Sequence, residues 1–422
     1  MEVRIERRQE VDLRFTAPPS KSVTHRALMI AALAEGESVI RRPLRAADTR
    51  LTAAALRSLG IDLVQEEESV RLQGCAGALP DTGGPVRLSL GNSGTTLRIM
   101  AGVSLLAPHP VCLTGDARMQ QRPFGPLGDA LVQAGGRVRY PVQEGYPPVE
   151  VQGPLRGGVV NLEGGMSSQF LSSLLIAGPY ARRTLAVCMR TPPVSRPYID
   201  LTLRTMEDFG VRPFRVGSEW FVVPEGVYRG RDYTVEGDWS SASYLCAIAA
   251  VCGGRVSVGG LERTSAQGDR IFPEILSAMG CRVRWNGDLL TVERDGPLEG
   301  IEVGMASAPD IVQTVAAVAA FARGSTTITG VAHLRYKESD RLEAIRRVLT
   351  AAGAGVTVEG DRLTIRPGPL RPLIVDPEND HRTAMSAAVI GLGAGGVVVR
   401  DAGCVEKSYP GFWEALVGVG LL

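Results

Sequence analysis

The chain has 422 residues, of which 44% are hydrophobic and 22% charged, and its formal net charge is +1 at pH 7. This length accommodates two or three domains with cores of their own. The near-neutral charge excludes a general basic surface for nucleic acid, so any anion site must come from local clustering of cations. No apolar run approaches the roughly 18 residues of a membrane span, and the charged, alternating N-terminal stretch does not resemble a signal peptide.

Seven cysteines occur in the chain without any C-x-x-C pair. An odd number in this arrangement favours buried free thiols in a reducing compartment over a disulfide framework or a zinc site. We therefore expect a cytoplasmic protein without a zinc site.

The first predicted helix, at residues 27–33, follows the polar stretch Ser-Lys-Ser-Val-Thr-His-Arg at residues 20–26. Two cations and three hydroxyls thus gather where unpaired backbone N–H groups and the positive end of the helix dipole also lie. Such a helix start suits an anion such as phosphate. The alternative is a well-capped, solvated helix end.

Lysine is rare: among 46 Lys and Arg residues, the lysines are Lys21, Lys337 and Lys407. An ammonium group is compact and gives up a proton when its surroundings require it, whereas a guanidinium stays charged. These three positions are therefore candidates for chemistry. The alternative is that three lysines among many arginines reflect chance.

An internal repeat organises the chain. Six segments share a polar start, a small-residue apolar helix, a glycine, a strand, a charged loop, a second helix ending at a glycine, and another strand. They begin near residues 24, 92, 167, 239, 308 and 379, and so recur about every 70 residues. Units of this size bury their faces on one another, so six make either a long solenoid or two compact groups of three.

Several elements of the repeat have clear local signals. Second helices are predicted at residues 51–59, 127–134 and 271–279, each before a glycine where a left-handed cap is expected. Strands are predicted at residues 255–258 and 397–399, which are short and β-branched. The glycine-rich run 391–396 follows a helix and precedes a strand, the reverse of the dinucleotide-binding order, so we predict no dinucleotide cofactor.

Each segment also starts its first helix with hydrogen-bonding residues, at 22–24, 91–95, 165–169, 240–241, 307 and 379–382. Several helix starts that face one cleft would attract anions strongly. At 240–241 and 307 we favour the simpler interpretation, in which the residues only cap a helix.

The second lysine belongs to the string Lys337-Glu338-Ser339-Asp340-Arg341, where a helix is predicted to begin with residues 342, 345, 348 and 349 on its apolar face. Lys337 lies four residues and Glu338 three residues before Arg341, so we expect the three to share one helix surface. The alternative is an exposed helix with ordinary salt bridges.

Seven segments together resemble, in order and spacing, the signature segments of the EPSP synthase family, the 3-phosphoshikimate 1-carboxyvinyltransferases. They are Ser20-Lys21-Ser22 with Arg26, residues 90–95, Gln121-Arg122-Pro123, residues 167–170, Arg196-Pro197-Tyr198, residues 337–341 and residues 379–382. Singly these motifs are modest, but the whole set spans the chain and is highly specific.

The resemblance implies an α/β protein with a two-domain enolpyruvyl-transferase-like fold of six βαβαββ repeats, three per domain. Domain I would comprise residues 1–18 and 239–422, and domain II residues 19–238. The two domains would close over the substrates. The resemblance also implies a cytoplasmic monomer that needs no metal or cofactor and binds neither nucleic acid nor membrane.

The implied reaction transfers the enolpyruvyl group of phosphoenolpyruvate to the 5-hydroxyl of shikimate 3-phosphate, with release of phosphate after a tetrahedral intermediate. The resemblance assigns shikimate 3-phosphate to Lys21, Ser22, Arg26, Ser167, Ser168, Gln169, Ser195, Tyr198, Asp310, His333 and Lys337. It assigns phosphoenolpyruvate, and the inhibitor glyphosate, to the site of Lys21, Asn92, Gly94, Arg122, Gln169, Arg341, Arg382 and Lys407.

The chemistry agrees with these residue types. Addition to the enol carbon needs a base for the hydroxyl, for which Asp310 is the candidate, and an acid for the methylene, for which the candidate proton carriers are Lys21, Glu338 and Lys407. Departure of phosphate needs clustered positive charge, which several of the named cations supply. The alternative for Asp310 is a purely structural role in a first helical turn.

Two other functions compete with this one. A sister enolpyruvyl transferase that acts on a UDP-aminosugar shares the fold, but it usually has a reactive cysteine in a loop of domain II, and here Cys75 and Cys112 lie outside the matching loop around Arg122. A catalytically silent phosphate-ligand binding protein of the same fold is the second alternative. Retention of all three lysines and of both candidate acidic groups, Asp310 and Glu338, argues against it.

Overall fold

The computed structural model describes residues 1–422 and divides into two compact units. The continuous unit is Pro19–Val235, and the split unit combines Met1–Pro18 with Glu236–Leu422. The sequence-based division uses the same crossing at 18/19 and sets the other boundary slightly later, at 238/239. Among the helices, none combines the length and the apolar character that crossing a membrane requires.

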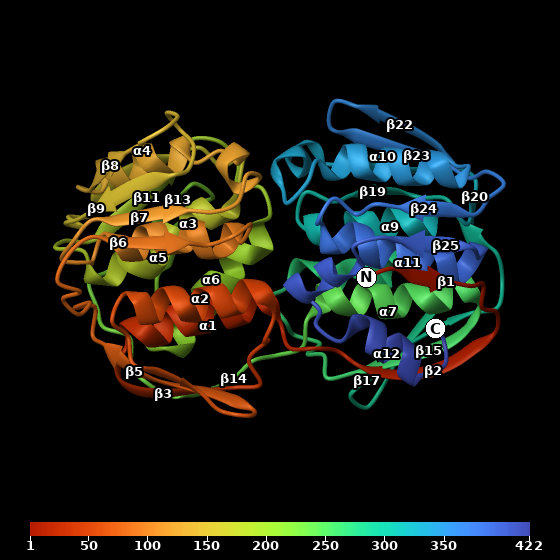
Figure 1. Ribbon diagram of the computed structural model, residues 1–422, viewed down its shortest axis with the longest axis horizontal. Helices are drawn as coiled ribbons and strands as arrows, with labels where there is room; N and C mark the ends of the chain where they lie inside the picture. Colours follow the sequence, from red (N-terminus) through yellow and green to blue (C-terminus); the bar gives the residue numbers. More distant parts are fainter. The chain divides into compact units, whose positions relative to one another are not determined.

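The continuous unit contains six α-helices, shown in red to yellow-green in Figure 1. They are α1 (Lys21–Leu33), α2 (Ala47–Ser58), α3 (Gly94–Ser104), α4 (Gly125–Gln133), α5 (Ser168–Ala177) and α6 (Arg196–Asp208). Its strands are β3 (Glu35–Arg41), β4 (Leu63–Gln65), β5 (Ser69–Cys75), β6 (Val86–Ser89), β7 (Val111–Thr114), β8 (Arg137–Arg139), β9 (Val149–Gln152), β10 (Gly158–Leu162), β11 (Leu185–Met189), β12 (Phe214–Val216), β13 (Trp220–Val223) and β14 (Asp232–Thr234). Short 3-10 helices are η1 (Met119–Gln121) and η2 (Gly178–Tyr180).

The split unit has a similar make-up. Its α-helices are α7 (Trp239–Cys252), α8 (Phe272–Ala278), α9 (Val312–Ala319), α10 (Arg341–Ala352), α11 (His381–Ala394) and α12 (Phe412–Gly418). Its strands are β1 (Val3–Ile5), β2 (Val11–Thr16), β15 (Gly254–Gly259), β16 (Arg282–Asn286), β17 (Leu289–Arg294), β18 (Leu298–Glu299), β19 (Glu302–Gly304), β20 (Ala322–Arg323), β21 (Thr326–Thr329), β22 (Gly355–Glu359), β23 (Arg362–Arg366), β24 (Leu373–Val375) and β25 (Val397–Val399). Its 3-10 helices are η3 (Gly268–Ile271), η4 (Pro309–Ile311), η5 (Ala332–Tyr336) and η6 (Ala402–Lys407).

One sheet topology recurs in both units. In the order β6-β7-β9-β8, the first pair is parallel and the other two pairs are antiparallel. The sheets β10-β11-β13-β12 and β19-β21-β23-β22 have the same pattern. The recurrence explains why the chain reads as a repeat of mixed α/β units.

Three further sheets follow this pattern with a strand from a distant part of the chain. Strand β14 pairs in parallel with β3 in the sheet β14-β3-β5-β4, and β2 pairs in parallel with β15 in the sheet β16-β17-β15-β2. In the three-stranded sheet β1-β25-β24, β24 and β25 are parallel and β1 is antiparallel to β25. The N-terminal segment therefore completes two sheets of the split unit.

The predicted glycine caps are confirmed. Gly60, Gly135 and Gly280 follow the ends of α2, α4 and α8, with φ angles of 86°, 103° and 101°. A residue with a Cβ rarely adopts this left-handed conformation, so glycine ends the helix at little conformational cost.

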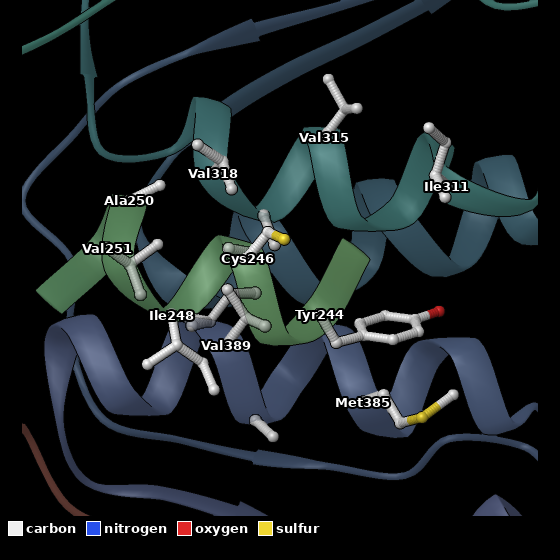
Figure 2. Packing of buried hydrophobic residues seen from close by; sticks show 14 of the residues in the cluster. Tyr244, Cys246, Ile248, Ala250, Val251, Ile311, Val315, Val318, Met385 and Val389 are labelled. Carbon is white, nitrogen blue, oxygen red and sulfur yellow. The ribbon is translucent and has the colours of Figure 1, made fainter. Parts of the chain in front are cut away.

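The core of the split unit is built on α7, all of whose residues are buried. Figure 2 shows α7 (green) between α9 and α11, the two helices against which it packs. A helix that is apolar on every side is a core helix. Each fully buried Val, Leu or Ile contributes about 1.5–3 kcal/mol, so this packing holds the three helices together.

Candidate active site

In the continuous unit, helix α1 begins with Lys21. Ser20 caps the helix and accepts a hydrogen bond from the backbone N–H of Val23 at 3.5 Å. The buried Lys21 Nζ lies 3.4 Å from Oδ2 of Asp48, which is in the first turn of α2. A second helix thus holds the ammonium group beside the first turn of α1.

Arg26 joins α1 to α6. Its Nε donates to Thr202 Oγ1 at 2.8 Å, and its terminal nitrogens donate to the carbonyl oxygens of Ser22 at 2.8 Å and Tyr198 at 3.1 Å. Burial lowers the pKa of the Arg26 guanidinium to about 10. These partners are neutral oxygens, so the positive charge of Arg26 has no carboxylate among its hydrogen-bond partners.

The start of α3 lies against Arg122. Arg122 Nη1 donates to the carbonyl oxygen of Asn92 at 3.1 Å and to its Oδ1 at 2.9 Å. A Cβ on Gly94, the first residue of α3, would lie only 2.5 Å from Arg122 Nη2. Any side chain at this position would therefore require the guanidinium of Arg122 to move.

Helix α5 brings a polar cluster to the same unit. Ser167 caps the helix and accepts from the N–H of Gln169 at 3.3 Å. The Gln169 side chain accepts from Arg98 at 2.7 Å and donates to Thr95 at 2.8 Å. The side-chain amide therefore bridges the starts of α3 and α5, and Ser168 begins α5 beside it.

Ser195 precedes α6 in a left-handed conformation with a φ of 56°. Its Oγ is buried and has no hydrogen-bond partner within the chain. Tyr198, in the first turn of α6, shares its carbonyl oxygen between Arg26 and Thr202. A strained backbone and an unsatisfied buried hydroxyl mark this helix start as a candidate site for a hydrogen-bonding ligand.

In the split unit, the buried Arg341 contacts three carboxylates. Its nitrogens lie 2.9 Å from Asp380, 3.0 Å from Asp310 and 2.7 Å from Glu338. Burial acts to lower the pKa of Arg341, but Asp380, Glu338 and Asp310 raise it above its ordinary value. The guanidinium is thus fixed in its charged form.

Asp310 is shared by two arginines, because Arg382 Nη2 lies 2.8 Å from its second oxygen. The buried Asp380 caps α11, accepts from the N–H of Arg382 at 3.0 Å, and accepts from Ser339 Oγ at 2.9 Å. The candidate base and two candidate phosphoenolpyruvate ligands, Arg341 and Arg382, therefore belong to one network of ion pairs and hydrogen bonds.

Lys407 ends the short helix η6 in the same unit. Its Nζ is buried and has no hydrogen-bond partner within the chain. His333, in η5, is also buried, and burial together with Lys337 lowers its pKa to about 4. Burying the ammonium group of Lys407 costs free energy unless an anion pairs with it.

One prediction about this region is wrong. Helix α10 begins only at Arg341, and Lys337 follows the 3-10 helix η5, so Lys337 and Arg341 do not share a helix surface. Asp340 is the N-cap of α10 and accepts from the N–H of Glu343 at 3.1 Å. Glu338 still reaches Arg341, but it does so from the segment before the helix.

The expected caps at residues 240–241 and 307 are also absent. Asp238 caps α7 by accepting from the N–H of Ser241 at 2.7 Å. Ser240 instead donates its hydroxyl to the buried Asp269 of η3. After Ser307 the chain forms η4, which carries Asp310, before α9 begins. Of these helix starts, only that of α7 therefore has a side-chain cap, and the acidic residue before the two serines provides it.

Three carboxylates near the predicted residues were not singled out from the sequence. Asp48 pairs with Lys21, Asp380 pairs with Arg341, and the pKa of Asp269 is raised to about 7 by burial and by the neighbouring Asp310. Asp380 lies in the motif at residues 379–382 and directly before a helix, as an N-cap residue does, so its capping role could have been predicted from the sequence. Asp48 and Asp269 reach the site through tertiary packing, which leaves no local signal.

Solved structures define the class of fold. Over the whole chain the structure is similar to EPSP synthase from Acinetobacter baumannii, with a TM-score of 0.82, 28% identity and 98% of that chain covered. It also matches the enolpyruvyl transferase NikO from Streptomyces tendae, with a TM-score of 0.77, 19% identity, and 99% and 97% of the two chains covered. The fold is that of an enolpyruvyl transferase.

Sequence relatives define the family. The family described as EPSP synthase (3-phosphoshikimate 1-carboxyvinyltransferase) matches residues 5–416. Proteins named 3-phosphoshikimate 1-carboxyvinyltransferase are 55% identical in Methanoculleus marisnigri, over all of both chains, and 39% identical in Serratia proteamaculans, over 96% of this chain and 95% of that one. The chain belongs to the EPSP synthase family.

Proposed function

We propose that the chain transfers the enolpyruvyl group of phosphoenolpyruvate to the 5-hydroxyl of shikimate 3-phosphate and releases phosphate through a tetrahedral intermediate. Membership of the EPSP synthase family over nearly the whole length supports this activity. The reaction makes the chain a transferase of the shikimate pathway, in aromatic amino-acid biosynthesis.

The structural observation that carries the proposal is the position of Asp310 between Arg341 and Arg382, at 3.0 and 2.8 Å. A general base must lie within reach of the hydroxyl that it deprotonates. Cations must lie where negative charge collects on the departing phosphate. One carboxylate held by two guanidiniums supplies both requirements in a single cluster.

The first step adds the 5-hydroxyl oxygen to C2 of phosphoenolpyruvate. Asp310 takes the hydroxyl proton, and a proton is delivered to the C3 methylene, for which Lys21, Glu338 and Lys407 are candidates. The second step breaks the bond between C2 and the phosphate oxygen while C3 loses a proton. Arg341 and Arg382, with Arg122 and Lys407, would stabilise the departing phosphate.

The continuous unit would supply most of the anion binding. Lys21, Ser22, Arg26, Ser167, Ser168, Gln169, Ser195 and Tyr198, with His333 and Lys337 of the split unit, would contact shikimate 3-phosphate. Lys21, Asn92, Gly94, Arg122 and Gln169 would contact phosphoenolpyruvate. The buried, unsatisfied hydroxyl of Ser195 supports its assignment, because such a group otherwise costs about 1–3 kcal/mol.

A phosphate-release assay tests the proposal against both alternatives. We expect release with phosphoenolpyruvate plus shikimate 3-phosphate and none when a UDP-aminosugar replaces shikimate 3-phosphate. Release with the UDP-aminosugar alone would favour the sister enzyme. Binding of both substrates without phosphate release would indicate a silent binding protein.

We also expect the chain to act as a monomer in the cytoplasm. Light scattering of the purified protein at the concentration used in the assay tests the first expectation. A mass twice that of the 44.9 kDa chain would contradict it.

A further inference from the structure

Four side chains form a continuous polar chain through the core of the continuous unit. His25 Nδ1 lies 2.7 Å from Thr52 Oγ1, which lies 2.8 Å from Thr96 Oγ1, which in turn lies 2.7 Å from Ser93 Oγ. All four residues have 0% of their surface exposed. His25 belongs to α1, Thr52 to α2 and Thr96 to α3, three helices that pack on one another.

Burying these four polar side chains costs free energy, so we expect them to have a role beyond packing. A buried hydroxyl or imidazole that lacks a partner destabilises a core, whereas apolar residues of similar size would pack without that risk. A connected polar chain instead fixes one arrangement of the elements that carry it. Its last atom, His25 Nε2, is buried without a hydrogen-bond partner. Burial and the neighbouring Lys21 and Arg26 lower the pKa of His25 well below its ordinary value, so the imidazole acts as a neutral hydrogen-bonding group.

Both ends of the polar chain lie next to predicted substrate contacts. Ser93 is the N-cap residue of α3, but its hydroxyl contacts Thr96 instead of capping the helix, and the next residue is Gly94. Thr96 also donates to the carbonyl oxygen of Asp48 at 3.4 Å, and Asp48 pairs with Lys21. His25 itself lies one helical turn after Lys21.

We propose that His25, Thr52, Thr96 and Ser93 form a positioning network that fixes the Ser93–Gly94 corner relative to Lys21 and thereby sets the affinity for phosphoenolpyruvate. The inference rests on the proposed function. Arg26, which is assigned to shikimate 3-phosphate alone, is held differently, by Thr202 and Tyr198 of α6. Loss of the network should therefore affect one substrate and spare the other.

The test replaces Thr96 by valine, which keeps the branched shape and removes the hydroxyl. For Thr96→Val we expect the KM for phosphoenolpyruvate to rise about tenfold, with the KM for shikimate 3-phosphate within about twofold and kcat within about threefold of the unmodified protein. Thr96→Ser, which restores a hydroxyl, should recover most of the affinity. Thr52→Val should give the same pattern, and the double variant should be no worse than the more affected single variant, since one network is broken either way.

Thr205→Val is the matched control. Thr205 is also buried in this unit, but its hydroxyl donates to the carbonyl oxygen of Leu201 in its own helix at 2.8 Å. We expect Thr205→Val to change the melting temperature of the protein as much as Thr96→Val does and to leave both KM values unaltered. A shift of both KM values together, or an equal KM shift in Thr205→Val, would show that the network only stabilises the fold.

The failure of this inference differs from failure of the proposed function. If the unmodified protein releases no phosphate from its two substrates, the proposed function is wrong and the inference falls with it. If the unmodified protein is active but Thr96→Val and Thr52→Val keep its KM for phosphoenolpyruvate, the inference alone is wrong. If Thr96→Val does not fold, Thr52→Val gives the same decision.

Discussion

The two units surround their cations with different partners. In the continuous unit, Arg26 and Arg122 donate to carbonyl, hydroxyl and amide oxygens. In the split unit, Arg341 contacts three carboxylates and Arg382 contacts one. Arg26 is thus held by neutral oxygens, whereas Arg341, which is equally buried, is held by negative charge.

This difference indicates a division of labour. Neutral partners orient a guanidinium and leave its charge available to an anionic ligand. Carboxylates offset the charge, and they are also the groups that accept and donate protons during a reaction. We therefore expect the carboxylates Asp310 and Glu338 of the split unit, together with Lys21, to move protons, and the neutral-partnered Arg26 to bind an anion.

The largest expected effects concern the lysines. In the continuous unit, Lys21 differs from Arg26 because its partner, Asp48, is a carboxylate. Lys21→Arg and Lys407→Arg should lower kcat by about 10²–10⁴-fold, since a guanidinium cannot release a proton. Lys337→Arg should mainly raise KM. Steady-state kinetics, with circular dichroism to verify folding, measure both. Three folded variants with unaltered kinetics would show that the rarity of lysine is a compositional accident.

The second prediction compares two buried arginines by their cost to stability. Arg341→Met leaves three carboxylates without their cation and should lower the free energy of unfolding by about 3–5 kcal/mol. Arg26→Met leaves only neutral oxygens and should cost about 1–3 kcal/mol. Urea unfolding of both variants measures the difference.

Arg346→Met is the control for this comparison. Arg346 and Glu343 form an exposed pair on α10, so its removal should leave the free energy of unfolding nearly unchanged. Equal costs for Arg341→Met and Arg26→Met would contradict the distinction between charged and neutral partners.

The third prediction concerns pH and the split unit. The pKa of Asp269 is raised to about 7, so between pH 4 and 7 the folded protein keeps a proton that the unfolded chain loses. This group therefore makes the unmodified protein less stable as pH rises through that range. Asp269→Asn lacks the effect, and its stability relative to the unmodified protein should increase by about 1–2 kcal/mol from pH 5 to pH 7.

Thermal and urea unfolding at several pH values measure this relative stability. Asp288→Asn, at an exposed position, is the control and should show a constant difference. A relative stability of Asp269→Asn that stays constant from pH 5 to pH 7 would mean that Asp269 is already ionised in the folded protein.

The smallest effect is expected at Gly94. The Cβ of Gly94→Ala would displace Arg122 from its present position, so the KM for phosphoenolpyruvate should rise about tenfold and glyphosate should bind more weakly, a change of about 1.4 kcal/mol. Gly165→Ala is the control, because no atom lies within 4 Å of its added Cβ. A changed KM for shikimate 3-phosphate alone would mean that residues 90–95 contact the other substrate.

Local signals in the sequence were sufficient for much of the fold. The glycines after α2, α4 and α8 and the β-branched runs of β15 and β25 each determine one element with nearby residues. Local signals could not predict the pairing of β2 with β15, because these two strands lie more than 200 residues apart in the chain. The same limit explains Asp48 and Asp269, whose positions depend on helix packing.

The candidate residues themselves came from the family resemblance and from the rarity of lysine, and their roles stay predictions. Of the residues assigned to phosphoenolpyruvate in the split unit, Arg341 and Arg382 both pair with Asp310, and Arg341 also pairs with Asp380. The misplaced start of α10 has a simple cause. Periodicity identified the apolar face correctly, but Asp340 begins the helix as its cap and confines Lys337 to the preceding turn.

The pairing of the N-terminal strands with strands much later in the chain has a consequence for synthesis on the ribosome. Every strand of the continuous unit, β14 included, emerges within Pro19–Val235, so that unit has all its partners well before translation ends. Strand β1 must wait for β25 at Val397–Val399, tens of seconds later at about 5–20 residues per second. Strand β1 is therefore still unpaired in the nascent chain after β2 has gained its partner β15. Nascent-chain proteolysis should find Val3–Ile5 among the last segments to become protected.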